Sequence, residues 1–443
     1  MASCIFSSLN QWMISIPETR NLDGVVYYDI MVQIGDVSWT VSRRYNEFSQ
    51  LNTALIKEQG LNKCLLPPKR FVGNANPEFV DQRRGQLELY LNTIFKLLVK
   101  TMPSELASFL ELEEHDIMFI IRKIPDKLSK CKQGTGSCPE LRVLDIHALS
   151  TRLKLPCPPA EMSGYQHDFC CILESCSRLK ALRVDGTEIA NMGGHLPSMD
   201  FIPFKALRHL ILNNVPPDFI SNADALRNTL CGLSWLNSGL KSVEDALLCD
   251  SVHKNLFDQK VWSLKKFDLS NNALKEISDA VTMIPNLTVL ELSGNQIECL
   301  GGLNSLEKLE KLSLKNNGIK TFSKLGLDNR LSKLTWLNLH NNNLSSVKGI
   351  EFLKELRYLD ITNNRISDFK EVALISSLPQ VATLILCGNP ISFVCDYRVK
   401  VLELFNERAT FISLDHELPN QRELDKIAVL QALRMVKEGR API

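Results

Sequence analysis

The chain has 443 residues, of which 44% are hydrophobic and 23% charged, and its formal net charge is +1. This length exceeds one ordinary hydrophobic core and predicts two or three folding units with the composition of a soluble globular protein. The near-zero charge excludes nucleic-acid binding through a global electrostatic field, and no apolar run reaches the roughly 18 residues that span a bilayer.

The 13 cysteines are scattered and form no C-x-x-C pair. The tightest cluster, Cys170, Cys171 and Cys176, has no matching His-x-x-x-His, so buried reduced thiols are favoured over the alternative of a zinc site. The first thirty residues lack the pattern of a secretory signal. We therefore expect a cytoplasmic protein without a metal or cofactor, whose membrane contact is peripheral.

The first predicted elements form a small α+β unit. A strand is predicted by apolar alternation, a turn at Gly35-Asp36 leads into a strand around 39–41, and a helix is expected from Asn46. The alternating residues are Val26, Tyr28, Ile30, Val32 and Ile34. The helix from Asn46 places Phe48, Leu51 and Leu55 on one face, and a second helix is predicted at about 81–99.

Three short motifs in this unit carry basic residues. They are Arg43-Arg44-Tyr45 at a strand-to-helix junction, Pro67-Pro68-Lys69 in a turn, and Arg83-Arg84 early in the second helix. Residues 40–84 hold 8 Lys and Arg against 4 Asp and Glu, whereas residues 1–115 hold 11 against 13. The local excess of basic charge predicts an anion site, because guanidinium groups bind phosphate in a bidentate manner and lysine adds a mobile charge.

These motifs resemble the PX domain family. The resemblance implies a three-stranded antiparallel sheet with helices that binds phosphatidylinositol 3-phosphate. Arg44 would hold the 3-phosphate, Tyr45 would pack on the inositol, Lys69 would reach the 1-phosphate, and Arg83 would hold the 4- and 5-hydroxyls. Phe71 and Val72 would insert into the membrane, or else pack beneath their loop. Some PX domains bind lipid weakly or bind proteins instead.

A repeat dominates the second half of the chain. The template L-x-x-L-x-L-x-x-N-x-L fits six successive segments at spacings of 22 to 25 residues, which predicts a leucine-rich-repeat solenoid with a parallel sheet. Three weaker copies that lack the asparagine precede it. The six asparagines, expected to bond turn backbone, are Asn272, Asn295, Asn317, Asn342, Asn364 and Asn389.

The resulting domain organisation is a PX unit at 10–122, a linker at 123–170 with some local order, a solenoid at 171–412 and a helical cap at 413–443. The cap is expected because an open solenoid end exposes apolar core, and a helical pattern runs from about 422 to 437. The third template position should face the concave side. There, Trp336 and Tyr358 would be neighbours with His340 beside them, forming a partner-binding hot spot unless a loop or the cap covers them.

The pairing of the two modules resembles the nischarin (imidazoline-receptor candidate protein) family over essentially the whole chain. Supporting strings include the segments at 62–69, 389–392 and 396–398. The resemblance implies an endosome-associated scaffold in integrin- and Rac-type signalling, although integrin contacts lie after the repeats in longer members and are not carried over. The partner could be a small GTPase, a kinase or a receptor tail.

Catalysis is not expected, because nucleophile-elbow, P-loop and zinc-protease motifs are all lacking. The alternative to a membrane adaptor is a phosphatase- or GTPase-binding regulatory subunit that uses only the repeats, with a PX domain that does not bind lipid.

Overall fold

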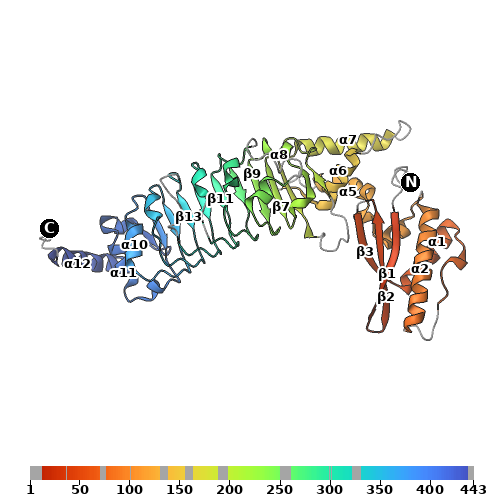
Figure 1. Cartoon of the computed structure of the whole chain (residues 1–443), viewed down its shortest axis with the longest axis horizontal. Coiled ribbons are helices and arrows are strands. Elements are labelled where there is room, and N and C mark those ends of the chain that lie inside the picture. Colours follow the sequence, from red (N-terminus) through yellow and green to blue (C-terminus); the bar gives the residue numbers. More distant parts are fainter. Residues whose placement is uncertain are drawn as a thin grey trace. The chain divides into compact units, whose positions relative to one another are not determined.

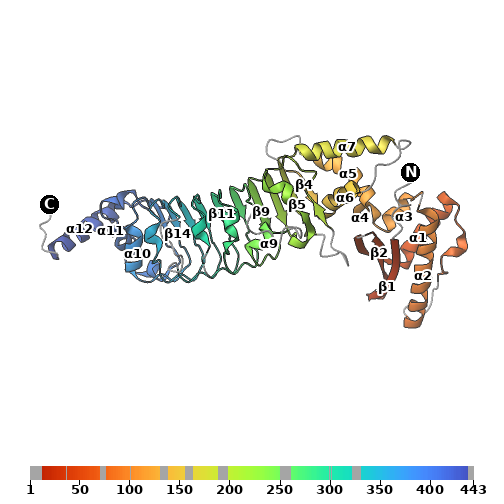
Figure 2. The ribbon, with the colours of Figure 1, turned by 45° about the horizontal axis from the view of Figure 1, so that its top comes forward.

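The computed structural model contains two compact units, one comprising Met1–Glu174 with Gly186–Asp200 and the other Ser175–Asp185 with Phe201–Ile443. Their elements are labelled in Figures 1 and 2. The residues described are 12–35, 37–69, 76–99, 101–129, 138–154, 163–187, 198–249, 261–298, 300, 302–321 and 331–437.

The first unit opens with a three-stranded antiparallel sheet of order β1-β2-β3. Its strands are β1 (Trp12–Leu22), β2 (Val25–Ile34) and β3 (Val37–Arg44). The alternation expected along the second strand is confirmed, since Tyr28, Ile30 and Val32 are all almost completely buried. These side chains lie on the face that the helices cover.

The helices that follow are α1 (Tyr45–Gln59), α2 (Pro77–Leu98), α3 (Ser104–Phe109) and α4 (Leu112–His115). Helix α1 begins one residue before the expected Asn46, because the Glu47 carboxylate accepts the Arg44 N–H at 2.9 Å and caps the helix there. Helix α2 begins several residues before 81, since Asn76 caps it and Pro77 occupies its first position.

Helix α2 also covers the open edge of β1. The Glu88 carboxylate accepts the Ile16 N–H at 2.7 Å, Arg84 donates to the Ile16 carbonyl at 2.7 Å, and Asn92 donates to the Ile14 carbonyl at 2.9 Å. These bonds satisfy backbone groups of an edge strand and fix the rotation of α2 about its axis. The adjacent Arg83 is therefore held at a defined position.

The region interpreted as a linker contains ordered structure. Helix α5 (Ile117–Ser129), strand β4 (Glu140–Arg142), helix α6 (Val143–Lys154) and the first part of α7 (Ser163–Arg178) lie there. Helix α6 buries apolar and polar side chains alike along most of its length. Sequence patterning underestimated this segment because burial on several sides of a short helix leaves no clean helical periodicity.

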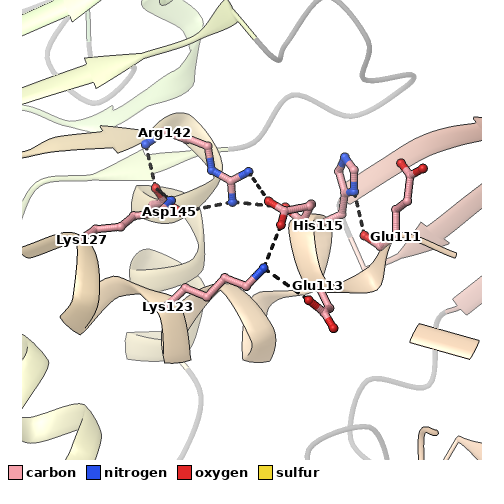
Figure 3. Close-up of polar contacts among 8 residues, drawn as sticks. Glu111, Glu113, His115, Lys123, Lys127, Arg142 and Asp145 are labelled. Carbon is pink, nitrogen blue, oxygen red and sulfur yellow. Dashed lines mark hydrogen bonds and ion pairs between the residues drawn. The ribbon is translucent and has the colours of Figure 1, made fainter. Parts of the chain in front are cut away.

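A charge network joins these helices to α4 (Figure 3). The Asp145 side chain is only 1% exposed and accepts bonds from Lys127 at 2.6 Å and from the Arg142 N–H at 2.8 Å. The Glu114 carboxylate accepts from Lys123 at 2.8 Å and from the Arg142 guanidinium at 3.0 Å. Arg142 thus bridges an acid on α4 and a buried acid on α6, so the segments from α4 to α6 pack as one structure.

The second unit is a stack of short parallel strands in the order β16-β15-β14-β13-β12-β11-β10-β9-β7-β5, and its middle strands follow one another in Figure 1. The six expected repeats and the three weaker leading copies all contribute strands to this sheet. The strands are β5 (Ala181–Asp185), β7 (His209–Asn213), β9 (Gly232–Leu236), β10 (Lys266–Asp268), β11 (Val289–Glu291), β12 (Lys311–Ser313), β13 (Trp336–Asn338), β14 (Tyr358–Asp360), β15 (Thr383–Ile385) and β16 (Ser413–Leu414).

The remaining described elements are two short strands and several helices. They are β6 (Met199–Asp200), β8 (Ile220–Asn222), α8 (Asp224–Arg227), α9 (Val243–Leu247), α10 (Phe369–Ser376), α11 (Tyr397–Glu403) and α12 (Gln421–Lys437), with 3-10 turns between the strands. Helices α10, α11 and α12 lie at the C-terminal end of the stack (Figure 2). Among the described residues, no helix is both long and apolar enough to cross a membrane.

The asparagine of each repeat does what its position predicts. The Asn342 amide, for example, donates to the carbonyls of Leu314 and Leu339 at 2.9 and 3.0 Å, and its oxygen accepts the Ile319 N–H at 3.1 Å. Asn295, Asn364 and the other conserved positions of the template repeat this pattern between neighbouring turns. Each asparagine therefore joins two repeats through backbone groups that the stack would otherwise leave unpaired.

The C-terminal end closes as a small helical layer. Strand β16 extends the parallel sheet into the segment assigned to the cap, and the Asp415 carboxylate accepts the Leu386 N–H at 2.8 Å, a group that in the preceding repeats bonds a backbone carbonyl of the next strand. Arg398 of α11 pairs with Glu423 of α12 at 2.7 Å. The helix expected at about 422–437 is thus present, whereas residues 438–443 lie outside the described residues.

Candidate functional site

The two arginines at the end of β3 have different environments. Arg43 donates to the Phe109 carbonyl at 3.1 Å and pairs with Glu111 at 2.9 Å, so it holds α3 and α4 against the sheet. The Arg44 side chain is 52% exposed, and its nearest acid, Glu47, is 3.8 Å away. An exposed pair at this distance contributes little, so the Arg44 guanidinium is available to an anion.

Tyr45 links the start of α1 to the proline turn. Its hydroxyl donates to the Pro67 carbonyl at 2.5 Å, and its ring is half-buried. Burial raises the pKa of Tyr45, although the nearby Arg83 opposes the shift. The hydroxyl therefore stays protonated at physiological pH and continues to donate, which positions the turn that leads to Lys69.

Arg83 lies beneath this surface, with only 6% of its area exposed. Its guanidinium carbon is 4.5 Å from the centre of the Tyr45 ring and 4.2 Å from the centre of the Phe79 ring. Burial raises the pKa of Tyr28, while a hydrogen bond and positive charge from Arg83 partly offset it. The cation is thus held among three aromatic side chains, an environment in which cation–π attraction is strong because water is excluded.

Of the residues expected to form the anion site, the structure places Tyr45 and Arg83 in contact, while Arg44 and Lys69 are related to them through neighbours in sequence. Arg83 contacts Tyr45, Tyr45 bonds to Pro67, Arg44 precedes Tyr45, and the exposed Lys69 follows Pro67 by two residues. Phe71 and Val72, expected to insert into the membrane, lie outside the described residues. Phe79 and Tyr28 were missed; the position of Phe79, one helical turn before Arg83, could have indicated it.

The repeat unit presents a row of side chains at the first residue of successive strands. The register pairs Lys311 with Trp336, Trp336 with Tyr358 and Tyr358 with Thr383, as expected from the template. The Trp336 and Tyr358 rings stack with their centres 5.3 Å apart and an interplanar angle of 11°. Both are half-buried, so part of each ring remains accessible to a partner.

His340 follows Trp336 by four residues, which corresponds to about 13 Å of extended chain. Its backbone N–H donates to the Asn338 side chain at 2.8 Å, and the residue is half-exposed.

Comparisons with known families match both units. Residues 32–113 match the PX domain, and residues 262–305, 285–329 and 332–376 match leucine-rich repeats. The chain carries a PX domain followed by leucine-rich repeats. PX domains are a phosphoinositide-binding family, and leucine-rich repeats are a protein-binding module.

Three curated relatives match a stretch of 87 to 100 residues of the chain. The human kinesin-like protein KIF16B is 31% identical over 98 residues, the rat PX domain-containing protein kinase-like protein 35% over 100, and the rat serine/threonine-protein kinase Sgk3 30% over 87. These matches cover 21%, 22% and 19% of this chain, and 7%, 17% and 18% of the relatives. The chain therefore spans less than a fifth of each relative's length.

Solved structures match each module separately. The Leptospira interrogans leucine-rich-repeat protein LIC12759 is 18% identical with a TM-score of 0.41, covering 58% of this chain and 61% of that one. A designed CISK-PX domain is 30% identical with a TM-score of 0.21, covering 22% of this chain and 97% of that one.

Within the PX domain, the arrangement is suited to binding a phosphate that is attached to a ring. An exposed guanidinium, an exposed ammonium and an aromatic face supported by a buried cation recognise charge and shape together. Because Tyr45 and Arg83 are already held by other protein groups, little side-chain entropy would be lost at these two residues on binding.

Proposed function

We propose that the chain is a non-enzymatic adaptor that binds phosphatidylinositol 3-phosphate on endosomal membranes and holds a protein partner on its repeats. The observation that carries the proposal is the exposed Arg44 next to the Tyr45–Arg83 contact and the proline turn of Lys69. In this proposal Arg44 binds the 3-phosphate, Tyr45 packs on the inositol, Lys69 reaches the 1-phosphate and Arg83 bonds to ring hydroxyls.

The burial of Arg83 supports selectivity for a headgroup with free 4- and 5-hydroxyls. A guanidinium that already contacts two rings has limited freedom to move outward and pair with a bulky second phosphate. It can still donate to hydroxyls that are brought to it. The exposed Arg44 would then bind the 3-phosphate, which is the only phosphate on the ring besides the 1-phosphate diester.

A single headgroup contact gives weak and reversible membrane attachment, so a second signal is needed for residence on a membrane. We propose that the segment with Phe71 and Val72 supplies it by insertion. The pairing of PX domain and repeats supports membership of the nischarin family, with early or recycling endosomes as the location and integrin- or Rac-type signalling as the context.

We propose that the stacked Trp336 and Tyr358, with His340 further along the face, bind the protein partner. Aromatic pairs of this kind supply much of the binding energy at protein interfaces. A small GTPase, a kinase or a receptor tail would fit this role equally well.

Vesicle sedimentation tests the lipid half of the proposal. Full-length protein should pellet with vesicles containing phosphatidylinositol 3-phosphate and remain in solution with phosphatidylinositol alone. Arg44→Ala should abolish pelleting, whereas Lys57→Ala, which removes an exposed positive charge from the other end of α1, should not. Absence of pelleting by the unsubstituted protein would favour the regulatory-subunit alternative, in which only the repeats act, and equal pelleting of both variants would remove Arg44 from the lipid site.

A further inference from the structure

Two carboxylates lie next to each other on the exposed face of β10 and β11. Asp268 and Glu291 are register partners on adjacent parallel strands, so their side chains emerge on the same face. Both are half-buried, and burial raises the pKa of Glu291, with the negative charge of Asp268 adding to the shift. Among the described residues neither carboxylate forms an ion pair. One oxygen of Asp268 accepts bonds from the Ser270 N–H at 3.0 Å and from its hydroxyl at 2.6 Å, and Lys311 and a hydrogen bond from Ser313 partly stabilise Glu291.

The nearby lysines do not cancel the electrostatic repulsion between the Asp268 and Glu291 carboxylates. Lys266 and Lys311 belong to the row two residues earlier on their strands, about 6.6 Å away along the chain direction, and both are exposed. Solvent screens an exposed ammonium more effectively than a half-buried carboxylate. The acid pair is therefore a site where an added cation would be stabilised.

The acid pair and the aromatic stack lie on the same sheet face at a defined separation. The midpoint of the Asp268–Glu291 pair and the midpoint of the Trp336–Tyr358 pair are three strand spacings apart across the sheet and two residues apart along the strands. Combined at right angles, these separations correspond to about 16 Å. An extended peptide covers this distance in about five residues. Both features can therefore be reached by a single segment that crosses the strands.

We propose that the concave face binds a segment of a partner protein that carries a basic side chain and, about five residues away, a large apolar side chain. The basic group sits over Asp268 and Glu291, and the apolar group covers Trp336 and Tyr358. This proposal rests on the proposed role of the concave face and adds the chemistry of its partner. An arginine or lysine forms charge-assisted bonds to both carboxylates, whereas an acidic segment is repelled there.

The test uses a phage-displayed library of random dodecapeptides selected on the immobilised full-length protein. Synthetic versions of the enriched peptides are then titrated by fluorescence polarisation. The variants are Asp268→Asn with Glu291→Gln, which preserves side-chain shape, and Trp336→Ala with Tyr358→Ala. Glu298→Gln serves as the control, since this exposed acid pairs with Lys320 at 3.3 Å on the turn side of the repeats.

The proposal expects enriched peptides with a basic and an apolar residue about five positions apart. Their affinity should fall on the order of tenfold or more with the acid-pair variant and with the aromatic variant, and remain unchanged with Glu298→Gln. Peptides that lose binding only with the aromatic variant would overturn the proposed partner chemistry but keep the concave-face role. Peptides insensitive to both variants, or no enrichment, would overturn both.

Discussion

The buried Asp145 offers a sharp test of whether the helices after α4 belong to the folded PX unit. Its carboxylate is 1% exposed and accepts bonds from Lys127 at 2.6 Å and from the Arg142 N–H at 2.8 Å. In Asp145→Asn the negative charge disappears from a side chain that is 1% exposed, and the salt bridge to the Lys127 ammonium and the charge-assisted bond from the Arg142 N–H are both weakened. Breaking a buried pair in this way costs about 3–5 kcal/mol.

A matched control lies in the same network. Glu113 is 49% exposed and is 3.6 Å from Lys123, so Glu113→Gln should cost less than about 1 kcal/mol. Hydrogen exchange of the α6 amides, measured on the full-length protein by mass spectrometry, reports the local free energy of opening. We expect Asp145→Asn to accelerate exchange of residues 143–154 on the order of 10²-fold or more, and Glu113→Gln to leave it nearly unchanged.

Equal, small effects of the two substitutions would refute this reasoning. They would mean that α6 does not depend on the Asp145 carboxylate, and that the network in Figure 3 contributes no more than solvent-exposed pairs do. The segment would then behave as a loosely attached connection, as the sequence pattern alone suggested.

Three further predictions concern the repeats and the PX domain. Asn342→Ala leaves the buried Ile319 N–H and two carbonyls unpaired and should lower the free energy of unfolding by about 3 kcal/mol in urea titration, whereas Asn286→Ala, at an exposed turn, should have little effect. Tyr45→Phe removes the bond to Pro67 and should weaken phosphatidylinositol 3-phosphate binding about fivefold, and an unchanged affinity would show that this bond does not order the site. Burial raises the pKa of Asp29, but bonds from Arg20 and Ser42 outweigh it and hold the pKa below its ordinary value. The stability that Asp29 contributes is therefore present above about pH 4 and lost as the pH falls through the lowered pKa. Urea titrations should show a larger drop in the free energy of unfolding from pH 6 to pH 3 for the wild type than for Asp29→Asn.

The repeat architecture was predictable in detail because its signal is local and repeated. The repeat spacing predicts the strands, their register and the role of the asparagines, and it places Trp336 next to Tyr358, as the structure does. The pairing of Asp268 with Glu291 follows from the same register. The repulsion between these two carboxylates is not evident from sequence, because it depends on their burial and on the absence of an ion pair to either of them among the described residues.

The PX site was predictable only as a set of residues. Motif order selects Arg44, Tyr45, Lys69 and Arg83 as candidates, but it does not indicate that Arg83 is buried against Phe79 or that Arg43 forms an ion pair with Glu111. The Arg43–Glu111 pair joins residues 68 positions apart, which no local pattern encodes, whereas Phe79 lies one helical turn before Arg83. The segment from α5 to α6 was expected to be a linker with some local order, and its helical content was underestimated because its polar anchors, Arg142 and Asp145, resemble ordinary surface charges in sequence.

The central claim is that Arg44 and its neighbours form a pocket for a singly phosphorylated inositol headgroup. Titration calorimetry of the full-length protein with soluble short-chain phosphatidylinositol 3-phosphate tests it without any contribution from membrane insertion. The account predicts saturable 1:1 binding that Arg44→Ala eliminates and Lys57→Ala preserves. Absence of binding by the wild-type protein, or equal binding by Arg44→Ala, would contradict it.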